Sequence, residues 1–227
     1  MTLPAADAMK VLALDTATAA CSVAVTAGAR MLARRSEIMV RGHAEALMPM
    51  VEAAMAEAGL GYGDLDLVAT TVGPGSFTGL RIGLATARGI ALAAGVPVTG
   101  ATTLEVLAHG VSNLETVVAV LTARRGEVYA QAFDRARLAL APAMVLSPVA
   151  LAAGLPEGPL VLVGDGAEAV VAALDGGSTG IRAAVAPTLP DAAVLARLCA
   201  DRVAAEGPPA RPPSPLYVRP PGARPSV

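Results

Sequence analysis

The sequence predicts an α/β protein of two related lobes, each with a mixed β-sheet flanked by helices. One observation is the order strand, strand, strand, helix, strand, helix, which fits residues 10–95 and recurs more loosely over residues 116–174. Another is that the fourth strand of each half leads through a glycine-rich turn into a helix. The turns are Gly73-Pro-Gly75 in the first half and Gly164-Asp-Gly166 in the second. Alternation of strands and helices in this way is typical of α/β layers.

The first half has the clearer pattern. Alternating apolar residues and short apolar runs predict strands at Lys10–Thr16, Cys21–Thr26, Arg30–Glu37 and Leu65–Val72. Helical spacing predicts a helix from His43 to Ala58, ended by Gly59, and a second helix over Thr78–Ala94, ended by Gly95.

The second half repeats these elements. We expect strands at Thr116–Thr122, Glu127–Phe133, Leu138–Leu146 and Leu160–Val163, and helices at Val149–Ala153, Ala167–Leu174 and Asp191–Ala205. The tail from Gly207 is rich in proline and is not expected to form a regular element.

The doubled pattern is typical of the actin-like ATPase (ASKHA) fold, which sugar kinases and the nucleotide domains of Hsp70 share. We therefore expect a first lobe over residues 1–110, a reduced second lobe over 111–206 and a tail over 207–227. The last helix is the one element that could pack back on the first lobe instead. In this fold the hairpin after the first strand carries an acidic residue beside the phosphate site, and Asp15-Thr-Ala-Thr18 lies at that hairpin.

Composition excludes several classes of protein. With 54% hydrophobic and 16% charged residues, most of the chain should fold. A net charge of −2 and 2% aromatic residues argue against nucleic-acid binding by the chain alone. The two cysteines, Cys21 and Cys199, provide no disulfide framework. No segment has the pattern of a signal peptide or a membrane span, so we expect a cytoplasmic protein with no membrane partner.

Two motifs have alternative interpretations. Asp15, with Thr16, would lie near a phosphate or a hydrated cation, or Asp15 would only stabilise its own turn. The run Gly73-Pro-Gly-Ser-Phe-Thr-Gly79 follows a strand and opens a helix, a context that favours anion binding. The alternative is that its glycines permit tight turns and that Ser76 or Thr78 caps the helix.

The two long helices of the first half carry more small and apolar positions than one core-facing stripe needs. We expect them to pack together and to present a shared face to a partner protein, and methionine adapts well to such contacts. The alternative is that both helices are buried within the lobe. The residues predicted at the partner interface are Leu47, Met48, Val51, Met55, Gly79, Gly83 and Ala87.

Catalytic side chains are scarce. His43 and His109 are the only histidines, and neither has a second histidine at helical spacing. We therefore expect no catalytic residues and no bound metal.

Three segments together resemble the TsaB (YeaZ) family of bacteria. They are Leu12-Ala-Leu-Asp-Thr-Ala-Thr18, Gly42-His-Ala-Glu-Ala-Leu-Met-Pro49 and Gly73-Pro-Gly-Ser-Phe-Thr-Gly-Leu-Arg-Ile-Gly83. Ala123-Arg-Arg-Gly-Glu-Val-Tyr129 and Pro215-Leu-Tyr-Val-Arg219 are similar to the second-lobe hairpin and the C-terminal motif of that family.

The resemblance implies a role in forming threonylcarbamoyladenosine beside the anticodon of tRNA. In that family the paralogue TsaD performs the transfer, the ATPase TsaE joins it, and TsaB is a non-catalytic scaffold. The partners implied are thus a TsaD-like protein, a TsaE-like ATPase, tRNA through the complex only, and a second copy of the chain when isolated. No cofactor is implied for the isolated chain, and a nucleotide is left open at the partner interface.

Two sequence features bear on this assignment. The region that holds a His-x-x-x-His metal pair in TsaD corresponds to residues 100–108, which contain no histidine. The second-lobe hairpin carries Thr122 where the family usually has aspartate, which argues against a nucleotide role for that lobe. The rival functions are an independent sugar-kinase-like phosphotransferase and a metallopeptidase, a label that the wider family has carried.

Overall fold

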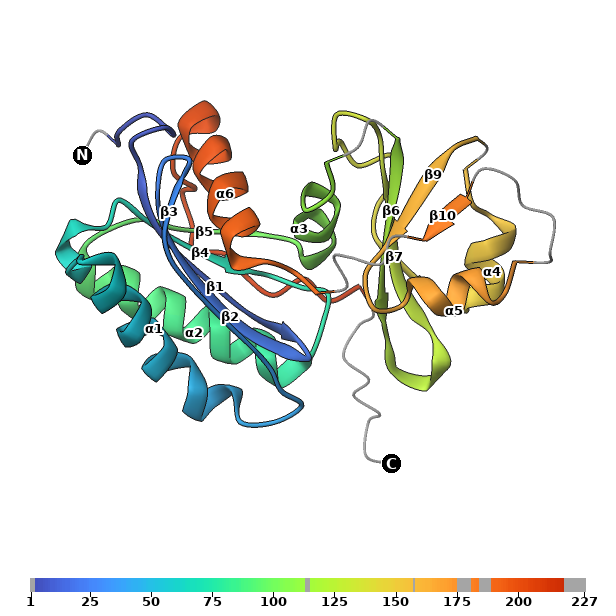
Figure 1. Cartoon of the computed structure of the whole chain (residues 1–227), viewed down its shortest axis with the longest axis horizontal. Helices are drawn as coiled ribbons and strands as arrows, with labels where there is room; N and C mark the ends of the chain where they lie inside the picture. The colour runs from blue at the N-terminus through green and yellow to red at the C-terminus, as the bar shows by residue number, and fades with distance from the viewer. Residues whose placement is uncertain (1–2, 113–114, 157, 175–180, 184–188, 219–227) are drawn as a thin grey trace.

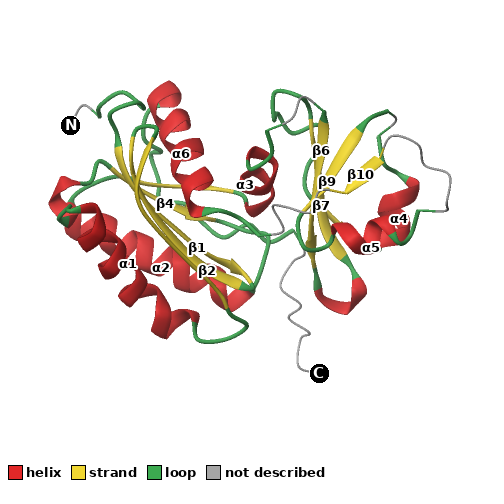
Figure 2. Cartoon of the chain, in the orientation of Figure 1, coloured by secondary structure: helices red, strands yellow, loops and turns green. Residues whose placement is uncertain are grey.

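A computed structural model describes residues 3–112, 115–156, 158–174, 181–183 and 189–218. Two five-stranded mixed sheets form two lobes (Figures 1 and 2). The strands are β1 (Lys10–Thr18), β2 (Ala20–Ala27), β3 (Arg30–Ile38), β4 (Leu67–Thr71), β5 (Val98–Ala101), β6 (Thr116–Thr122), β7 (Val128–Phe133), β8 (Met144–Leu146), β9 (Leu160–Val163) and β10 (Ile181–Ala183). The α-helices are α1 (His43–Ala58), α2 (Phe77–Ala94), α3 (Thr103–His109), α4 (Pro148–Ala153), α5 (Ala167–Val171) and α6 (Ala192–Glu206).

The two sheets have the same topology. The strand order is β3-β2-β1-β4-β5 in the first and β8-β7-β6-β9-β10 in the second. In each, the first three strands are antiparallel, and the first strand pairs in parallel with the fourth. The internal duplication predicted from the sequence is confirmed.

Helices cover the faces of both sheets (Figure 2). In the first lobe, α1 and α2 pack on one face and α6 packs on the other, each through its own hydrophobic cluster. In the second lobe, α3 covers the face toward the first lobe, and α4 and α5 cover the other. The last helix thus returns to the first lobe, where Leu195, Ala196 and Cys199 pack against Val11 and Ala13 of β1.

Three predicted elements are clearly shorter than expected, among them β4, which spans Leu67–Thr71 rather than Leu65–Val72. The strand predicted from Leu138 begins only at Met144, because Asp134 accepts a hydrogen bond from the Leu138 amide in a tight turn and Pro142 has no amide to pair. Helix α5 ends at Val171 rather than Leu174, since the amides of Ala173 and Leu174 bond three residues back in a tightened last turn. Among the described residues, no helix is long and apolar enough to cross a membrane.

Leu195 tests whether α6 is part of the first-lobe core. Its side chain is fully buried against the sheet, so Leu195→Ala should lower the free energy of unfolding by about 2–5 kcal/mol in urea titrations. Arg197→Ala, two residues along on the exposed side of α6, should change it by no more than about 0.5 kcal/mol. Equal effects of the two substitutions would contradict the packing described here.

Candidate functional site

A cleft of about 820 Å³ lies between the two lobes. The first lobe contributes the β1–β2 turn, the loop before α1 and the start of α2, and the second lobe contributes the β6–β7 turn and Asp165. The C-terminal segment adds Tyr217. This is the position at which the sequence predicted a phosphate-facing hairpin.

Asp15 lies beneath this cleft and is fully buried. Its Oδ1 accepts hydrogen bonds from the Thr71 hydroxyl at 2.6 Å and from the Ala17 amide at 3.2 Å. Its Oδ2 has no hydrogen-bond partner within the described part of the chain. Burial raises the pKa of the Asp15 carboxyl to about 6, against the opposing effect of the two hydrogen bonds.

Thr16 is buried as well, and its hydroxyl donates to the Gly79 carbonyl at 2.7 Å. Neither Asp15 nor Thr16 is among the residues that line the cleft. The prediction that these two residues bind a cofactor stays untested, but in this conformation a ligand in the cleft would meet Ala17 and Thr18 instead.

Helix α2 closes over the hairpin through three glycines. A Cβ at Gly75 would lie 2.2 Å from the Ala17 carbonyl oxygen, and one at Gly79 would lie 2.0 Å from that of Thr16. A Cβ at Gly83 would lie 2.6 Å from the Thr16 hydroxyl. Any larger residue at these positions would push the helix and the hairpin apart.

Two amides around the start of α2 are hydrogen-bonded within the chain. The Ser76 amide donates to the Ala17 carbonyl at 2.7 Å, and the Ser76 hydroxyl caps α2 by accepting from the Gly79 amide at 3.3 Å. These bonds support the interpretation of this run as a tight turn with a helix cap rather than as an anion site.

Six of the seven residues predicted at a partner interface are buried inside the chain, so for them the prediction is wrong. They are Leu47, Val51, Met55, Gly79, Gly83 and Ala87. Helix α1 packs on the sheet and on α2 with a face wider than one stripe, so Met50 and Met55 join the core. Met48 is 38% exposed and alone remains available to a partner.

Sequence reasoning missed the side chains that line the cleft. Arg41 and Arg124 bring positive charge to it from opposite lobes, and Glu45 and Asp165 bring negative charge. Asp165 lies in the second glycine turn and accepts a hydrogen bond from the Thr122 amide at 2.8 Å. The repeat of the glycine turns was the signal that could have identified it.

Aromatic residues gather at the same cleft. The chain has three tyrosines, two phenylalanines and no tryptophan. Three of these rings, those of Phe77, Tyr129 and Tyr217, line the cleft.

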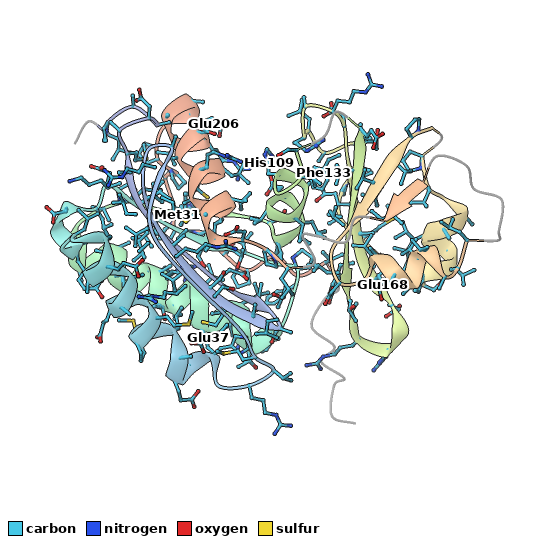
Figure 3. All side chains as sticks on the ribbon, viewed as in Figure 1. Met31, Glu37, His109, Phe133, Glu168 and Glu206 are labelled. Atoms are coloured by element: carbon cyan, nitrogen blue, oxygen red, sulfur yellow. The ribbon has the colours of Figure 1, made fainter. Side chains whose placement is uncertain are left out.

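The two histidines lie in different places. His43 is nearly buried at the edge of the cleft, and its Nε2–H donates to the Thr18 carbonyl at 3.1 Å. His109 ends α3 and lines a separate cavity of about 330 Å³ with Glu206 (Figure 3). Within the described ranges, no group of three or more His, Cys, Asp or Glu side chains could hold a metal ion.

The buried carboxyl of Asp15 should make stability depend on pH. Its pKa is about 6 in the folded chain against an ordinary value of 3.8, so the folded state binds the proton more tightly. This group therefore stabilises the fold below about pH 4, and that stabilisation is lost as the pH rises through 6. Asp15→Asn keeps the acceptor for Thr71 and removes the charge. Its stability relative to the parent should rise by roughly 2 kcal/mol between pH 4 and 7.5 in urea titrations.

The same titrations could also contradict the raised pKa of Asp15. A difference between Asp15→Asn and the parent that stays constant across this pH range would mean that the carboxyl has an ordinary pKa and is not desolvated.

Comparisons of the sequence and of the structure with known proteins agree on one family. The model of the TsaD family, tRNA N6-adenosine threonylcarbamoyltransferase, matches residues 35–195. The tRNA threonylcarbamoyladenosine biosynthesis protein TsaB of Escherichia coli (strain K12) is 40% identical over 130 residues, which cover 56% of each chain. The chain thus spans about half the length of the curated relatives that it matches.

Solved structures extend the match over nearly the whole chain. A crystal structure of an uncharacterised protein with similarity to the peptidase YeaZ, from Pseudomonas aeruginosa, superposes with a TM-score of 0.79 at 30% identity, covering 93% of this chain and 100% of that one. Component A of (R)-2-hydroxyglutaryl-CoA dehydratase from Acidaminococcus fermentans matches with a TM-score of 0.53 at 12% identity over 87% of this chain and 100% of that one. The second match supports the actin-like fold alone.

The family model, the identity to TsaB and the structural match over almost the full length agree, and this chain belongs to the TsaB (YeaZ) family, within the group of proteins that the TsaD model describes.

Proposed function

We propose that this chain is a non-catalytic subunit of a complex that forms threonylcarbamoyladenosine in tRNA. It pairs with a TsaD-like transferase, a TsaE-like ATPase joins the pair, and tRNA is contacted through the complex. The pathway is supported by the identity to the Escherichia coli tRNA threonylcarbamoyladenosine biosynthesis protein TsaB. We expect the protein to act in the cytoplasm.

The lack of catalysis is supported by how the cleft is built. The hairpin donors that could face a phosphate are engaged inside the chain: the Ala17 amide donates to Asp15 Oδ1, and the Thr16 hydroxyl donates to the Gly79 carbonyl. Lys10 is the only lysine, and it lies at the start of β1, the opposite end of that strand from the hairpin. Any nucleotide would have to use Arg41 and Arg124 from the two lobes, and we propose this only for the assembled complex.

The pairing proposal rests on an exposed glycine, Gly89, within a helix. This glycine lies in the middle of α2, is exposed, and an added Cβ would meet nothing within 4 Å. A glycine inside a helix costs roughly 0.5–1 kcal/mol relative to alanine, and nothing in the described fold requires it there. Close approach of another helix would require it.

The neighbouring exposed positions fit the same explanation. Several of them are small or flexible, which lets a helical partner approach closely: Thr78, Ala85 and Ala93 of α2, and Ala44, Met48 and Ala53 of α1, although Arg88, Leu92 and Glu52 are exposed there as well. The proposed docking surface is therefore the exposed side of α1 and α2, rather than the side formed by the buried residues that were first predicted. Without the transferase, we expect two copies of the chain to pair through this surface.

Substitutions at Gly89 distinguish its effect on the stability of the isolated chain from its effect on partner binding. Gly89→Ala should raise the free energy of unfolding of the isolated chain by about 0.5–1 kcal/mol. Gly89→Arg should leave the fold intact and weaken binding to a purified TsaD-like protein by about tenfold or more in titration calorimetry, which corresponds to about 1.4 kcal/mol. The matched control is Ala204→Arg, at an exposed position on α6.

Two outcomes would count against the proposal. If the parent chain does not bind the TsaD-like protein, the pairing itself is wrong. If the parent binds and Gly89→Arg binds equally well, the pairing stands but the outward side of α2 is not its surface.

A further inference from the structure

The C-terminal segment Pro213–Tyr217 crosses back over the first lobe, although its sequence gave no regular element. After α6, drawn in orange-red in Figure 1, the chain runs toward the centre of the molecule, between the lobes. The Leu216 amide donates to the carbonyl of Val72, just past the end of β4, at 2.7 Å. The Pro213 carbonyl accepts a hydrogen bond from Arg88 of α2.

The end of the segment forms a cluster with the first turns of α2. The rings of Tyr217 and Phe77 stack with centroids 5.6 Å apart and planes 28° from parallel. The guanidinium of Arg81 lies 3.9 Å from the centroid of Phe77, and its Nε donates to the Tyr217 hydroxyl at 3.4 Å. We call these three residues, Phe77, Arg81 and Tyr217, the latch.

The first lobe has a seat for this segment. A Cβ at Gly73 would lie 2.9 Å from the Leu216 carbonyl oxygen, and a Cβ at Gly100 would lie 3.1 Å from the Cβ of Pro213. Both glycines leave room for the returning chain, although the lobe itself also needs them, since a Cβ at Gly100 would lie 2.4 Å from Val72 Cγ1 and Gly73 has a φ of +107°.

The hold on the segment is nevertheless modest. None of its residues belongs to the four hydrophobic clusters of the described chain. The polar and ring contacts described for it are a backbone hydrogen bond, two bonds from exposed arginines and a ring stack on Phe77, which is 41% exposed. Segments held in this way open locally without unfolding of the core.

The segment also forms part of the functional cleft, because Tyr217 lines it beside Phe77 and Thr78. Release of the segment would remove one wall of the cleft and would break the hydrogen bonds that the exposed Arg81 and Arg88 make to it. Docking of the segment and access to the cleft are therefore coupled.

We propose that Pro213–Tyr217 is a reversible strap, fastened by the latch and by the hydrogen bond from Arg88 to the Pro213 carbonyl, that closes one wall of the interlobe cleft and opens as a unit. In the docked state it fixes the first turns of α2. In the released state the cleft is wider at Phe77. This device does not depend on the identity of the partner.

A fluorescent reporter tests the docked state. The chain contains no tryptophan, so Tyr217→Trp introduces a signal from the strap alone. Quenching by acrylamide should be about threefold weaker in this reporter than in the same reporter carrying Arg81→Ala and Arg88→Ala, because the open state is more populated there. Arg197→Ala in the reporter, on α6 and away from the strap, is the matched control and should leave quenching unchanged. Equal quenching of all three proteins would overturn the proposal.

Proteolysis of the chain with its own tyrosine provides a second measurement, free of any effect of tryptophan on docking. Chymotrypsin should cut after Tyr217 about threefold or more faster in Arg81→Ala/Arg88→Ala than in the parent, because the cleavage rate follows the open population. Intact mass identifies the product, and Arg197→Ala should match the parent. Equal rates in all three proteins would show that the two arginines do not fasten the strap.

Discussion

The contact on which the rest of the molecule depends is the close approach of α2 to the β1–β2 hairpin. It is possible only because Gly75, Gly79 and Gly83 have no side chains, since a Cβ at any of them would lie within 2.6 Å of the hairpin. The approach seals Asp15 and Thr16 beneath the cleft. It also occupies the Ala17 carbonyl and the Thr16 hydroxyl with bonds to the start of α2. The same helix that buries the hairpin leaves Gly89, on another of its sides, exposed to solvent.

The architecture was predictable because the same order of strands and helices occurs in both halves of the sequence. Alternating strands, two long helices and matching glycine turns gave the lobes, and the shared strand order of the sheets confirms the duplication. The elements that were not assigned are short: β5 and α3 follow one another within residues 98–109, and β10 spans Ile181–Ala183. A capping box, in which Thr102 and Glu105 exchange hydrogen bonds, marked the start of α3 and could have identified it.

The site was harder to predict because burial cannot be read from one helix alone. Met55 lies off the apolar stripe of α1 in sequence, yet the sheet and α2 together bury it, so a surplus of apolar residues did not imply a free surface. The small-residue stripe of α2 met the hairpin rather than a partner. Gly89, which the stripe did not include, is the position that the fold leaves unexplained. Tyr217 joins the cleft only because distant segments meet there, a contact that has no local pattern.

The central claim is that this chain contributes a surface rather than chemistry, because α2 occupies the hairpin at which an actin-like enzyme would hold phosphate. Steady-state ATP hydrolysis by the purified, isolated chain tests this most directly. The account predicts a rate no higher than that of a buffer blank containing ATP and magnesium. Steady turnover by the pure chain that is abolished by Asp15→Ala would contradict it, since the buried carboxyl would then have to reach a bound nucleotide.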